Sequence, residues 1–318
     1  MVSAMKLALT LILTLLVAAC SDDATSTTDG GLPSPDGPNA QQDQTVAPPV
    51  TFTLATWNVK NFFDEKDDPG LSDTVLTLAQ VQAKMQKLGS AIRALDADVL
   101  VLQEVEKLDL LQRLNKGYLG TMGYKEVWLS EGNDLRGIDV AMLSRYKVLQ
   151  YISNAKDTFP GVQDPGTNYG FSRDCVMAKL ELGTGRELRL LINHLRAGGG
   201  YTDLRRREAQ AQRVRVLADM VLKGDPQANL AVIGDLNDDA SSDTLKLIRD
   251  KAPALFSPTT LLPASGRKTF NKSKQLDYIL LAPGLKADLD NASVTVPFDS
   301  LFSSTSDHYP IRVKITLK

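Results

Sequence analysis

Short apolar runs alternate with longer amphipathic stretches along residues 50–318. The short runs are rich in leucine and β-branched residues, and several are apolar nearly throughout, as in strands buried on both faces. Residues 75–95 and 203–222 instead repeat apolar positions with helical spacing. The pattern predicts two long helices in those stretches, and strands at residues 51–57, 98–103, 138–144, 174–182, 187–195, 228–236, 275–283 and 309–318.

The order of these elements indicates the fold class. Strands separated by helices, together with strand pairs that no helix separates, predict a mixed α/β sandwich. No second linker and no internal repeat interrupts the alternation, so residues 50–318 form one predicted domain. The composition agrees with a globular domain, because 43% of the residues are hydrophobic and 23% are charged.

The first 20 residues have the pattern of an export signal. Lys6 precedes an apolar run, residues 7–19, that ends in small residues and Cys20. Since about 20 apolar residues are needed to span a bilayer, a retained transmembrane helix is the weaker interpretation. Residues 17–20 resemble a bacterial lipobox, which implies lipidation of Cys20. We therefore expect a signal peptide over residues 1–20 and a domain anchored to a bacterial envelope membrane, outside the cytoplasm.

Residues 21–49 are rich in Ser, Thr, Asp, Gly, Pro and Gln and lack apolar periodicity. Such a composition predicts a disordered linker, because it cannot bury enough apolar surface to fold. With Cys20 assigned to lipidation, only Cys175 remains, so no disulfide can form within the domain. We expect Cys175 to be a buried strand residue.

The charge of the chain does not identify its partner. The formal net charge is only −2, although residues 205–207 and 267–274 are locally basic. Charge runs usually serve solubility. Arg207, however, shares a helix face with Ala211 and Val214, so we expect it to point inward and to support a site.

Polar residues fall repeatedly at the ends of the predicted strands or inside them: Asn58, Glu104, Asp235, Asn237 and Asp277. In α/β sheets, ligands and catalytic groups gather at the carboxyl ends of strands. One such residue is commonly part of a turn. Five of them, in a chain with only two histidines that both lie in similar contexts, indicate a functional site.

Oxygen ligands of this kind suit a hard divalent cation. Mg²⁺ is usually held by one or two carboxylates, with substrate phosphate and water in its other positions. Asn58, Glu104 and Asp307 fit that role, and Mn²⁺ or Ca²⁺ are alternatives. The histidines, His194 and His308, fit a general acid or base and a donor to phosphoryl oxygens.

Eight segments in this order resemble the endonuclease/exonuclease/phosphatase superfamily, in particular its secreted deoxyribonucleases: TWNVKNFFD, LQEV, RGIDVAMLSR, FSRDC, INHL, IGDLND, LDYIL and SDHYP. The resemblance covers nearly all of residues 50–318. It implies a four-layer α/β sandwich, with two mixed β-sheets packed face to face, helices on the outer faces and the site at one edge. It also implies divalent-metal-dependent phosphoester hydrolysis.

The same resemblance implies roles for the metal-site and water-positioning residues. Glu104 matches the principal metal ligand, with Asn58 and Asp307 completing the set. Asp235 and Asn237 match the pair that positions the attacking water and the phosphate. A second metal near Asp235 is an open alternative.

The histidine roles also follow from the resemblance. His308 matches the catalytic histidine and Asp277 its carboxylate partner. His194 matches the histidine that donates to the phosphate, and Arg173 an arginine that contacts it. We expect Asp139 to be the partner of His194.

The substrate remains open between three classes. The first hypothesis is a surface-anchored nuclease that cleaves DNA or RNA. The second is a phosphatase or lipid phosphodiesterase acting on inositol phosphates or sphingomyelin. The third is an inactive surface binding module, which would require loss of a key residue such as Glu104 or His308, and none is lost. Nothing indicates an obligate protein partner, and residues 153–170 form a polar insertion that could line the substrate groove.

Overall fold

The computed structural model describes residues 48–318. The predicted signal peptide, Cys20 and all but the last two residues of the predicted linker lie outside the described residues. Within residues 48–318, the structure contains no helix that is both long and apolar enough to cross a membrane.

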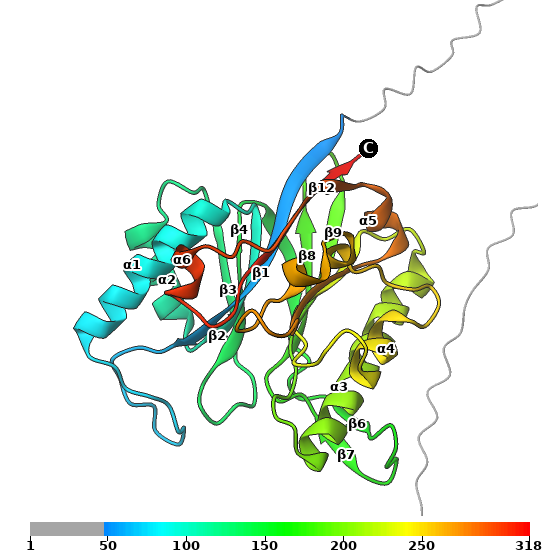
Figure 1. Cartoon of the computed structure of the whole chain (residues 1–318), viewed down its shortest axis with the longest axis horizontal. Coiled ribbons are helices and arrows are strands. Elements are labelled where there is room, and N and C mark those ends of the chain that lie inside the picture. The colour runs from blue at the N-terminus through cyan, green and yellow to red at the C-terminus, as the bar shows by residue number, and fades with distance from the viewer. Residues whose placement is uncertain (1–47) are drawn as a thin grey trace, which may run out of the picture. The chain divides into compact units, whose positions relative to one another are not determined.

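Two β-sheets dominate the domain (Figure 1). The first has six strands in the order β12-β13-β1-β2-β4-β3, and the second has five in the order β11-β10-β9-β8-β5. A separate pair, β6 and β7, forms a short hairpin. The bounds of the strands are β1 Val50–Phe62, β2 Val99–Val105, β3 Glu126–Ser130, β4 Asp139–Ser144, β5 Lys147–Ile152, β6 Thr158–Pro160, β7 Asn168–Gly170, β8 Cys175–Glu181, β9 Glu187–His194, β10 Leu230–Asp235, β11 Asp277–Leu281, β12 Leu289–Thr295 and β13 Ile311–Leu317.

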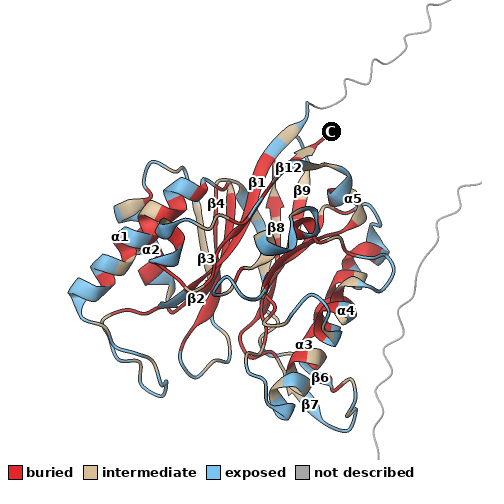
Figure 2. Ribbon diagram, viewed as in Figure 1, coloured by how far each residue is buried: buried red, intermediate tan, exposed pale blue. Residues whose placement is uncertain are grey.

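Helices cover the outer faces of both sheets. Figure 1 shows α1 (Leu78–Leu95) and α2 (Leu108–Tyr118) against the first sheet, and α3 (Tyr201–Gly224) and α4 (Asp243–Arg249) against the second. Short helices α5 (Pro283–Ala287) and α6 (Ser300–Ser303) lie in connections. Buried residues concentrate between the sheets and beneath the helices (Figure 2). The predicted four-layer α/β sandwich is confirmed.

Local sequence explains the ends of α1. The Thr77 side chain accepts from the backbone of Gln80 while the Gln80 side chain accepts from the backbone of Thr77, which forms a capping box. The helix ends at Asp96, which is in the left-handed conformation. Val81 and Leu88 lie on its buried face, so the helix packs one side against the first sheet.

Strand register brings the predicted site residues to one edge. β9 and β10 are parallel neighbours, and Asp235 is paired with His194 on one side and with Asp277 on the other. β1 and β2 are parallel neighbours in the facing sheet, so their carboxyl ends also meet at one edge. Gly234 makes this packing possible, because a Cβ there would lie 2.0 Å from the Asn193 carbonyl oxygen.

All eight predicted strands and both long helices are present. The two-stranded hairpin lies in the polar insertion at residues 153–170 and contacts α3. No residue of this insertion lines the main pocket, so its place in a substrate groove stays a prediction. Cys175 is buried, as expected.

Candidate active site

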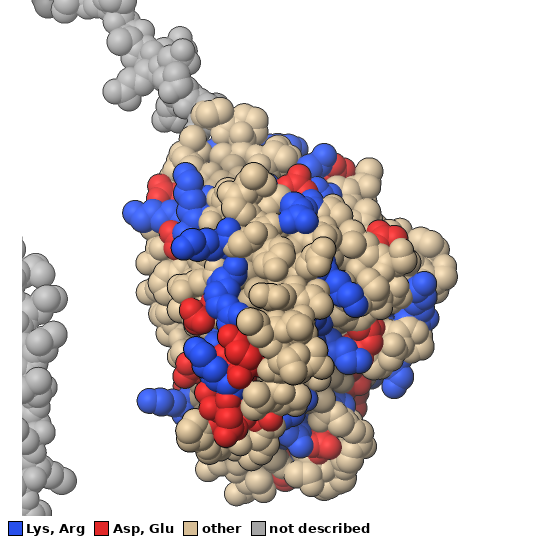
Figure 3. Space-filling view, turned by 90° about the vertical axis from the view of Figure 1, so that its left-hand side faces the viewer, with Lys and Arg blue, Asp and Glu red and all other residues tan. Residues whose placement is uncertain are grey.

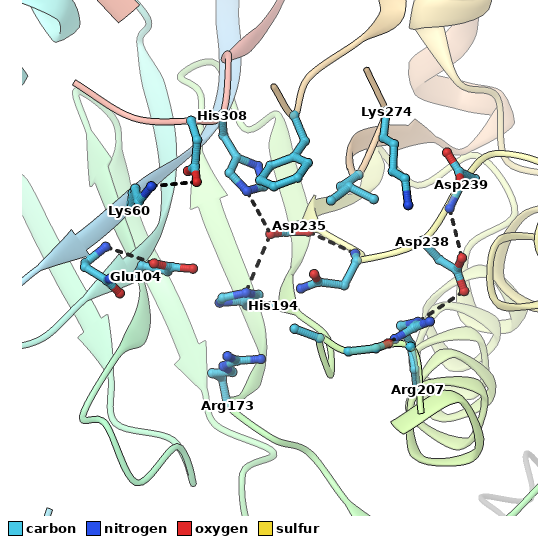
Figure 4. A pocket seen from close by; sticks show the side chains of 18 of the residues that line it. Lys60, Glu104, Arg173, His194, Arg207, Asp235, Asp238, Asp239, Lys274 and His308 are labelled. Carbon is cyan, nitrogen blue, oxygen red and sulfur yellow. Dashed lines mark hydrogen bonds and ion pairs between the residues drawn. The ribbon is translucent and has the colours of Figure 1, made fainter. Parts of the chain in front are cut away.

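A pocket of about 600 Å³ opens where the strand ends meet (Figure 4). Asn58 and Asp277 are almost completely buried and do not line it. The structure thus gathers most of the predicted site residues into one place. The predicted residues that line the pocket are Glu104, Arg173, His194, Arg207, Asp235, Asn237, Asp307 and His308.

The loop that carries Asp307 and His308 is held by the first strand. Trp57 Nε1 donates to the His308 carbonyl oxygen at 2.9 Å. Ser306 Oγ donates to the Asn58 carbonyl oxygen at 2.8 Å. Both donors are buried, so these hydrogen bonds fix the loop without competition from water.

His308 and Asp277 form a buried pair. His308 Nδ1 lies 2.8 Å from Asp277 Oδ2, while Nε2 lies 3.9 Å from Asp235 Oδ2. Burial opposes protonation of His308, but the charge of Asp277, its hydrogen bond and the charge of Asp235 outweigh it and raise the His308 pKa to about 10. The predicted pairing of the two residues is present, and it favours the imidazolium form.

Asp235 lies between the two histidines (Figure 4). Its Oδ2 is 3.6 Å from His194 Nε2 and accepts from Asn58 Nδ2 at 3.0 Å, while its Oδ1 accepts from the Asn237 backbone N–H at 2.9 Å. Burial, followed by the charge of Asp277, raises the Asp235 pKa to about 7. A carboxylate of this pKa can exchange a proton near neutral pH.

His194 is held neutral. Burial and the positive charges of Arg173 and His308 lower the His194 pKa well below its usual value. Its Nδ1 has no hydrogen-bond partner among residues 48–318. The predicted pairing with Asp139 is therefore corrected: Asp139 Oδ1 accepts from the Gly132 backbone N–H at 2.7 Å, and Asp139 lines a separate pocket.

The predicted metal ligands differ in how free their oxygens are. Glu104 accepts from Asn58 Nδ2 at 3.1 Å and from the Asn61 backbone N–H at 2.8 Å. Asp307 pairs with Lys60 Nζ at 2.8 Å. Asn58 Oδ1 already accepts from the Lys60 backbone N–H at 2.9 Å. Because both carboxylates still line the pocket, Glu104 and Asp307 fit a hard cation, whereas the Asn58 amide holds other carboxylates in place.

A second acidic group, formed by Asp235, Asp277 and His308, also has the spacing of a metal cluster. Its atoms are engaged with each other, since the imidazole is hydrogen-bonded to Asp277 and approaches Asp235. A protonated His308 would repel a cation there. The geometry therefore suits proton transfer at this group better than cation binding.

Basic side chains surround the pocket. Arg173 is buried and pairs with Asp134 at 2.8 Å, and it also donates to the Leu195 carbonyl oxygen at 3.0 Å. Lys60 and Arg136 line the pocket too, although the sequence did not single them out. Both lie in segments already linked to the family, TWNVKNFFD and RGIDVAMLSR, so the signal was close in sequence.

Arg207 points inward, as predicted. Its Nε donates to Asp238 Oδ2 at 3.1 Å, and one terminal nitrogen donates to the carbonyl oxygens of Arg196 and Gly198 at 2.9 and 2.8 Å. The Arg207 side chain is buried, even though Arg207 lies near the start of α3, which begins at Tyr201. Arg207 thus ties the loop of residues 195–200, which contains three consecutive glycines, to the loop after β10, and so supports one wall of the pocket.

Lys84 on α1 fixes the opposite wall. Its ammonium group donates to the carbonyl oxygens of Val59, Lys60 and Thr305 at 2.7, 3.0 and 2.7 Å. These residues directly follow Asn58 and precede Asp307. Lys84 therefore joins the end of β1 to the loop that carries His308.

A family model described as Endonuclease/Exonuclease/phosphatase matches residues 53–260. No curated protein matches the sequence. Among solved structures, the human Nocturnin catalytic domain with bound sulfate is 20% identical, with a TM-score of 0.62, over 84% of this chain and 95% of that one. Truncated Caenorhabditis elegans TDP2 is 16% identical, with a TM-score of 0.57, over 83% and 97%.

An endonuclease/exonuclease/phosphatase from Beutenbergia cavernae is 19% identical, with a TM-score of 0.59, over 84% of this chain and 72% of that chain. At these identities the structures show a shared fold. The family model covers well over half of the chain, and it includes Asn58, Glu104, Arg173, His194, Asp235 and Asn237, whereas Asp277, Asp307 and His308 lie beyond the matched segment. This chain belongs to the endonuclease/exonuclease/phosphatase family.

Proposed function

We propose that the chain is a divalent-metal-dependent phosphodiesterase that cleaves nucleic acid. The observation that carries the proposal is the position of Asp235 between His194 and His308, in a pocket whose other wall presents the carboxylates of Glu104 and Asp307. Proton-handling groups and oxygen ligands thus converge on one cavity. This combination suits attack of water on a phosphoester.

The side chains divide the reaction between them. Asp235 accepts the proton of the attacking water, and Asn237 beside it orients the water and the phosphate. His308, held as an imidazolium by Asp277, donates to a phosphoryl oxygen and supplies charge. A divalent cation held by Glu104 and Asp307 would neutralise the non-bridging oxygens and assist departure of the leaving oxygen.

His194 and Arg173 complete the phosphate side. Neutral His194 has one N–H, and it donates to the phosphate in the tautomer that carries the proton on Nε2, the nitrogen that faces Asp235. The Arg173 guanidinium is fixed by Asp134 and Leu195, so it offers a preset positive charge to the phosphate. The geometry favours binding of a phosphodiester anion over a neutral substrate.

A nucleic acid is favoured because the basic lining extends beyond one phosphate. A second pocket of about 580 Å³ shares Arg136, Arg173 and residues 197–198 with the first. Its lining also includes Arg196 and Arg206, against the acidic Asp134 and Asp203. The second pocket carries four arginines against two aspartates, so it suits a further phosphate of the same strand beside the first pocket.

The test compares substrates directly. The full chain is incubated with plasmid DNA, RNA, inositol phosphates and sphingomyelin, each with Mg²⁺ and with chelator. We expect chelator-sensitive cleavage of DNA or RNA. Hydrolysis of the lipid or inositol phosphate alone would replace the nuclease proposal, and no hydrolysis of any substrate would favour a binding module.

We also propose that Cys20 anchors the protein to a bacterial envelope membrane. The support is the sequence of residues 1–20, in which Lys6 and an apolar run precede the lipobox-like segment. A Cys20→Ser variant expressed beside the unchanged chain tests it. We expect the variant to lose incorporation of labelled fatty acid and to leave the membrane fraction. Equal membrane retention of both would contradict the anchor.

A further inference from the structure

We propose that Asp68, Asp73 and Glu106 form a binding site for a hard divalent cation, of the Ca²⁺ class, outside the active site. The three residues lie in the loop after β1 and just beyond the end of β2. Neither the family match nor the active-site argument assigns them a role.

The spacing of the ligand atoms suits one ion. One carboxylate oxygen from each of the three residues lies within 4.8 Å of the other two. Two oxygens bound to the same Ca²⁺ at about 2.4 Å can be at most about 4.8 Å apart. The three carboxylates can therefore share one ion with little movement.

Glu106 supplies an independent sign of a missing ligand. Its side chain is 3% exposed, and its Oε2 accepts from the Asp64 backbone N–H. Its Oε1 is buried and finds no hydrogen-bond donor anywhere in residues 48–318. A buried, unpaired carboxylate oxygen is costly, and a metal ion would satisfy it.

The local charge also favours a cation. Lys107 pairs with Asp68 Oδ1 at 2.5 Å and approaches Asp64 Oδ2 at 3.5 Å. In the described part of the chain these are its only ion pairs, so the ammonium of Lys107 pairs with two carboxylates and leaves those of Asp73 and Glu106 without an ion pair. A divalent ion would bring the group close to neutral.

The site is open to solvent. A pocket of about 340 Å³ is lined by Asp68, Glu106 and Lys107, so an ion can enter. Figure 3 looks onto the side of the molecule that carries α1, and acidic side chains gather among lysines and arginines on its lower part. The Asp68 backbone N–H donates to Asp73 Oδ2 at 3.2 Å, which already folds the loop around the carboxylates.

A bound ion would stabilise the neighbouring wall of the active site. The loop donates from the Ser72 backbone N–H to the Leu135 carbonyl oxygen at 2.6 Å. Leu135 directly precedes Arg136, which lines the main pocket. We therefore assign the ion a structural role beside the catalytic one.

The first experiment separates this site from the active site. Isothermal titration of Ca²⁺ into the chelator-treated full chain is repeated with Glu104→Gln and with Asp73→Asn. We expect Glu104→Gln still to bind one Ca²⁺, and Asp73→Asn to weaken that binding by about 10- to 100-fold or more. Asp243→Asn, an exposed acidic residue on α4, is the matched control and should leave binding unchanged.

Thermal unfolding distinguishes lost binding from lost folding. In chelator, Asp73→Asn should unfold at the same temperature as the wild type or higher, because one repulsive charge is gone. With Ca²⁺, only the wild type and Asp243→Asn should gain stability at this site. A lower unfolding temperature for Asp73→Asn in chelator as well would contradict the assigned role.

A Lys107→Met variant tests whether the lysine itself is the counter-ion. Removal of the ammonium should strengthen Ca²⁺ binding, because lysine and ion compete for the same carboxylates. The proposal is overturned if Glu104→Gln binds neither Ca²⁺ nor Mg²⁺ and if addition of Lys107→Met to that variant does not restore binding of either ion. These readouts need no substrate, so they are independent of the proposed nuclease activity.

Discussion

Asp235 on β10 is the direct register partner of His194 on β9, and their side chains approach to 3.6 Å. The same carboxylate lies 3.9 Å from Nε2 of His308, which is distant in sequence and directly precedes the last strand, β13. One histidine is held neutral and the other is held as a cation. The site therefore uses its two histidines differently, although both face one carboxylate.

Loss of the His308–Asp277 pair should abolish most of the activity while leaving the fold intact. We expect His308→Ala and Asp277→Asn each to lower kcat by about 100- to 10,000-fold, because each removes a group that acts on charge in the transition state. Steady-state kinetics measure the effect on the substrate that the comparison of DNA, RNA, inositol phosphates and sphingomyelin identifies. Circular dichroism checks that each variant is folded.

The double variant should be little worse than the worse single variant, since the two residues act as one unit. Multiplication of the two losses in the double variant would show that they act separately.

Lys84→Met should reduce catalysis even though Lys84 does not line the main pocket. The ammonium holds three carbonyl oxygens next to Asn58 and Asp307. A shift of about 1 Å in a catalytic group can cost about 100-fold, so we expect kcat to fall by about 10- to 100-fold with a smaller change in KM. Lys87→Met is the control, because within residues 48–318 Lys87, on the same helix, makes one hydrogen bond, to the Ser304 carbonyl oxygen at 3.3 Å. Equal kcat for both variants would refute the positioning role.

Asp139 should make stability depend on pH. Burial and the charges of Glu131, Asp134 and Asp174 raise the Asp139 pKa to about 7, against the hydrogen bond from Gly132. The folded pKa is thus above the unfolded value of 3.8, so stability is present at low pH and is lost as the pH rises from about 4 to about 7.

Asp139→Asn keeps an oxygen acceptor for the Gly132 backbone and cannot ionise. In chelator, the advantage of the variant over wild type should therefore grow by about 2 to 3 kcal/mol between pH 5 and pH 8. Urea unfolding at both pH values measures it. A constant difference between the two proteins would show that Asp139 keeps its normal ionisation.

Gly234→Ala should destabilise the domain strongly. Gly234 has φ 132° and a Cβ there would lie 2.0 Å from the Asn193 carbonyl oxygen, so the parallel pair of β9 and β10 would have to separate. We expect a loss of more than about 2 kcal/mol in the free energy of unfolding. Gly166→Ala is the control, because within residues 48–318 no atom beyond its own chain neighbours lies within 4 Å of its Cβ position. Similar stability of the two variants would contradict this account.

The short, nearly continuous apolar runs made the central strands predictable, because a run without polar residues is typical of a strand that is buried on both faces. The edge strands β3, β5 and β12 and the short hairpin strands β6 and β7 were not predicted, because they are short or only partly buried and carry little periodic signal. Site residues that lie close together in the sequence, such as Asp235 and Asn237, were also predictable, because a short motif contains both of them.

Pairings between distant side chains were harder to predict. The proposed link from Asp139 to His194 relied on approximate motif alignment, and the fold instead directs Asp139 toward Gly132. Lys84 lies on a helix whose pattern explains its packing face but not the three carbonyl oxygens it binds. Such contacts depend on how loops that follow separate strands come together in the folded domain. A local sequence pattern gives no information on that arrangement.

The hydrogen bonds from Trp57 and Ser306 determine which part of the domain must be present before the site can assemble. They join β1, the first strand of the domain, to the loop before β13, the last one. Asp307 and His308 therefore join the pocket from the connection that precedes β13. A domain cut short before residue 307 would hold Glu104 and Asp235 but would lack both residues and the two hydrogen bonds that place them, so it could not assemble the site.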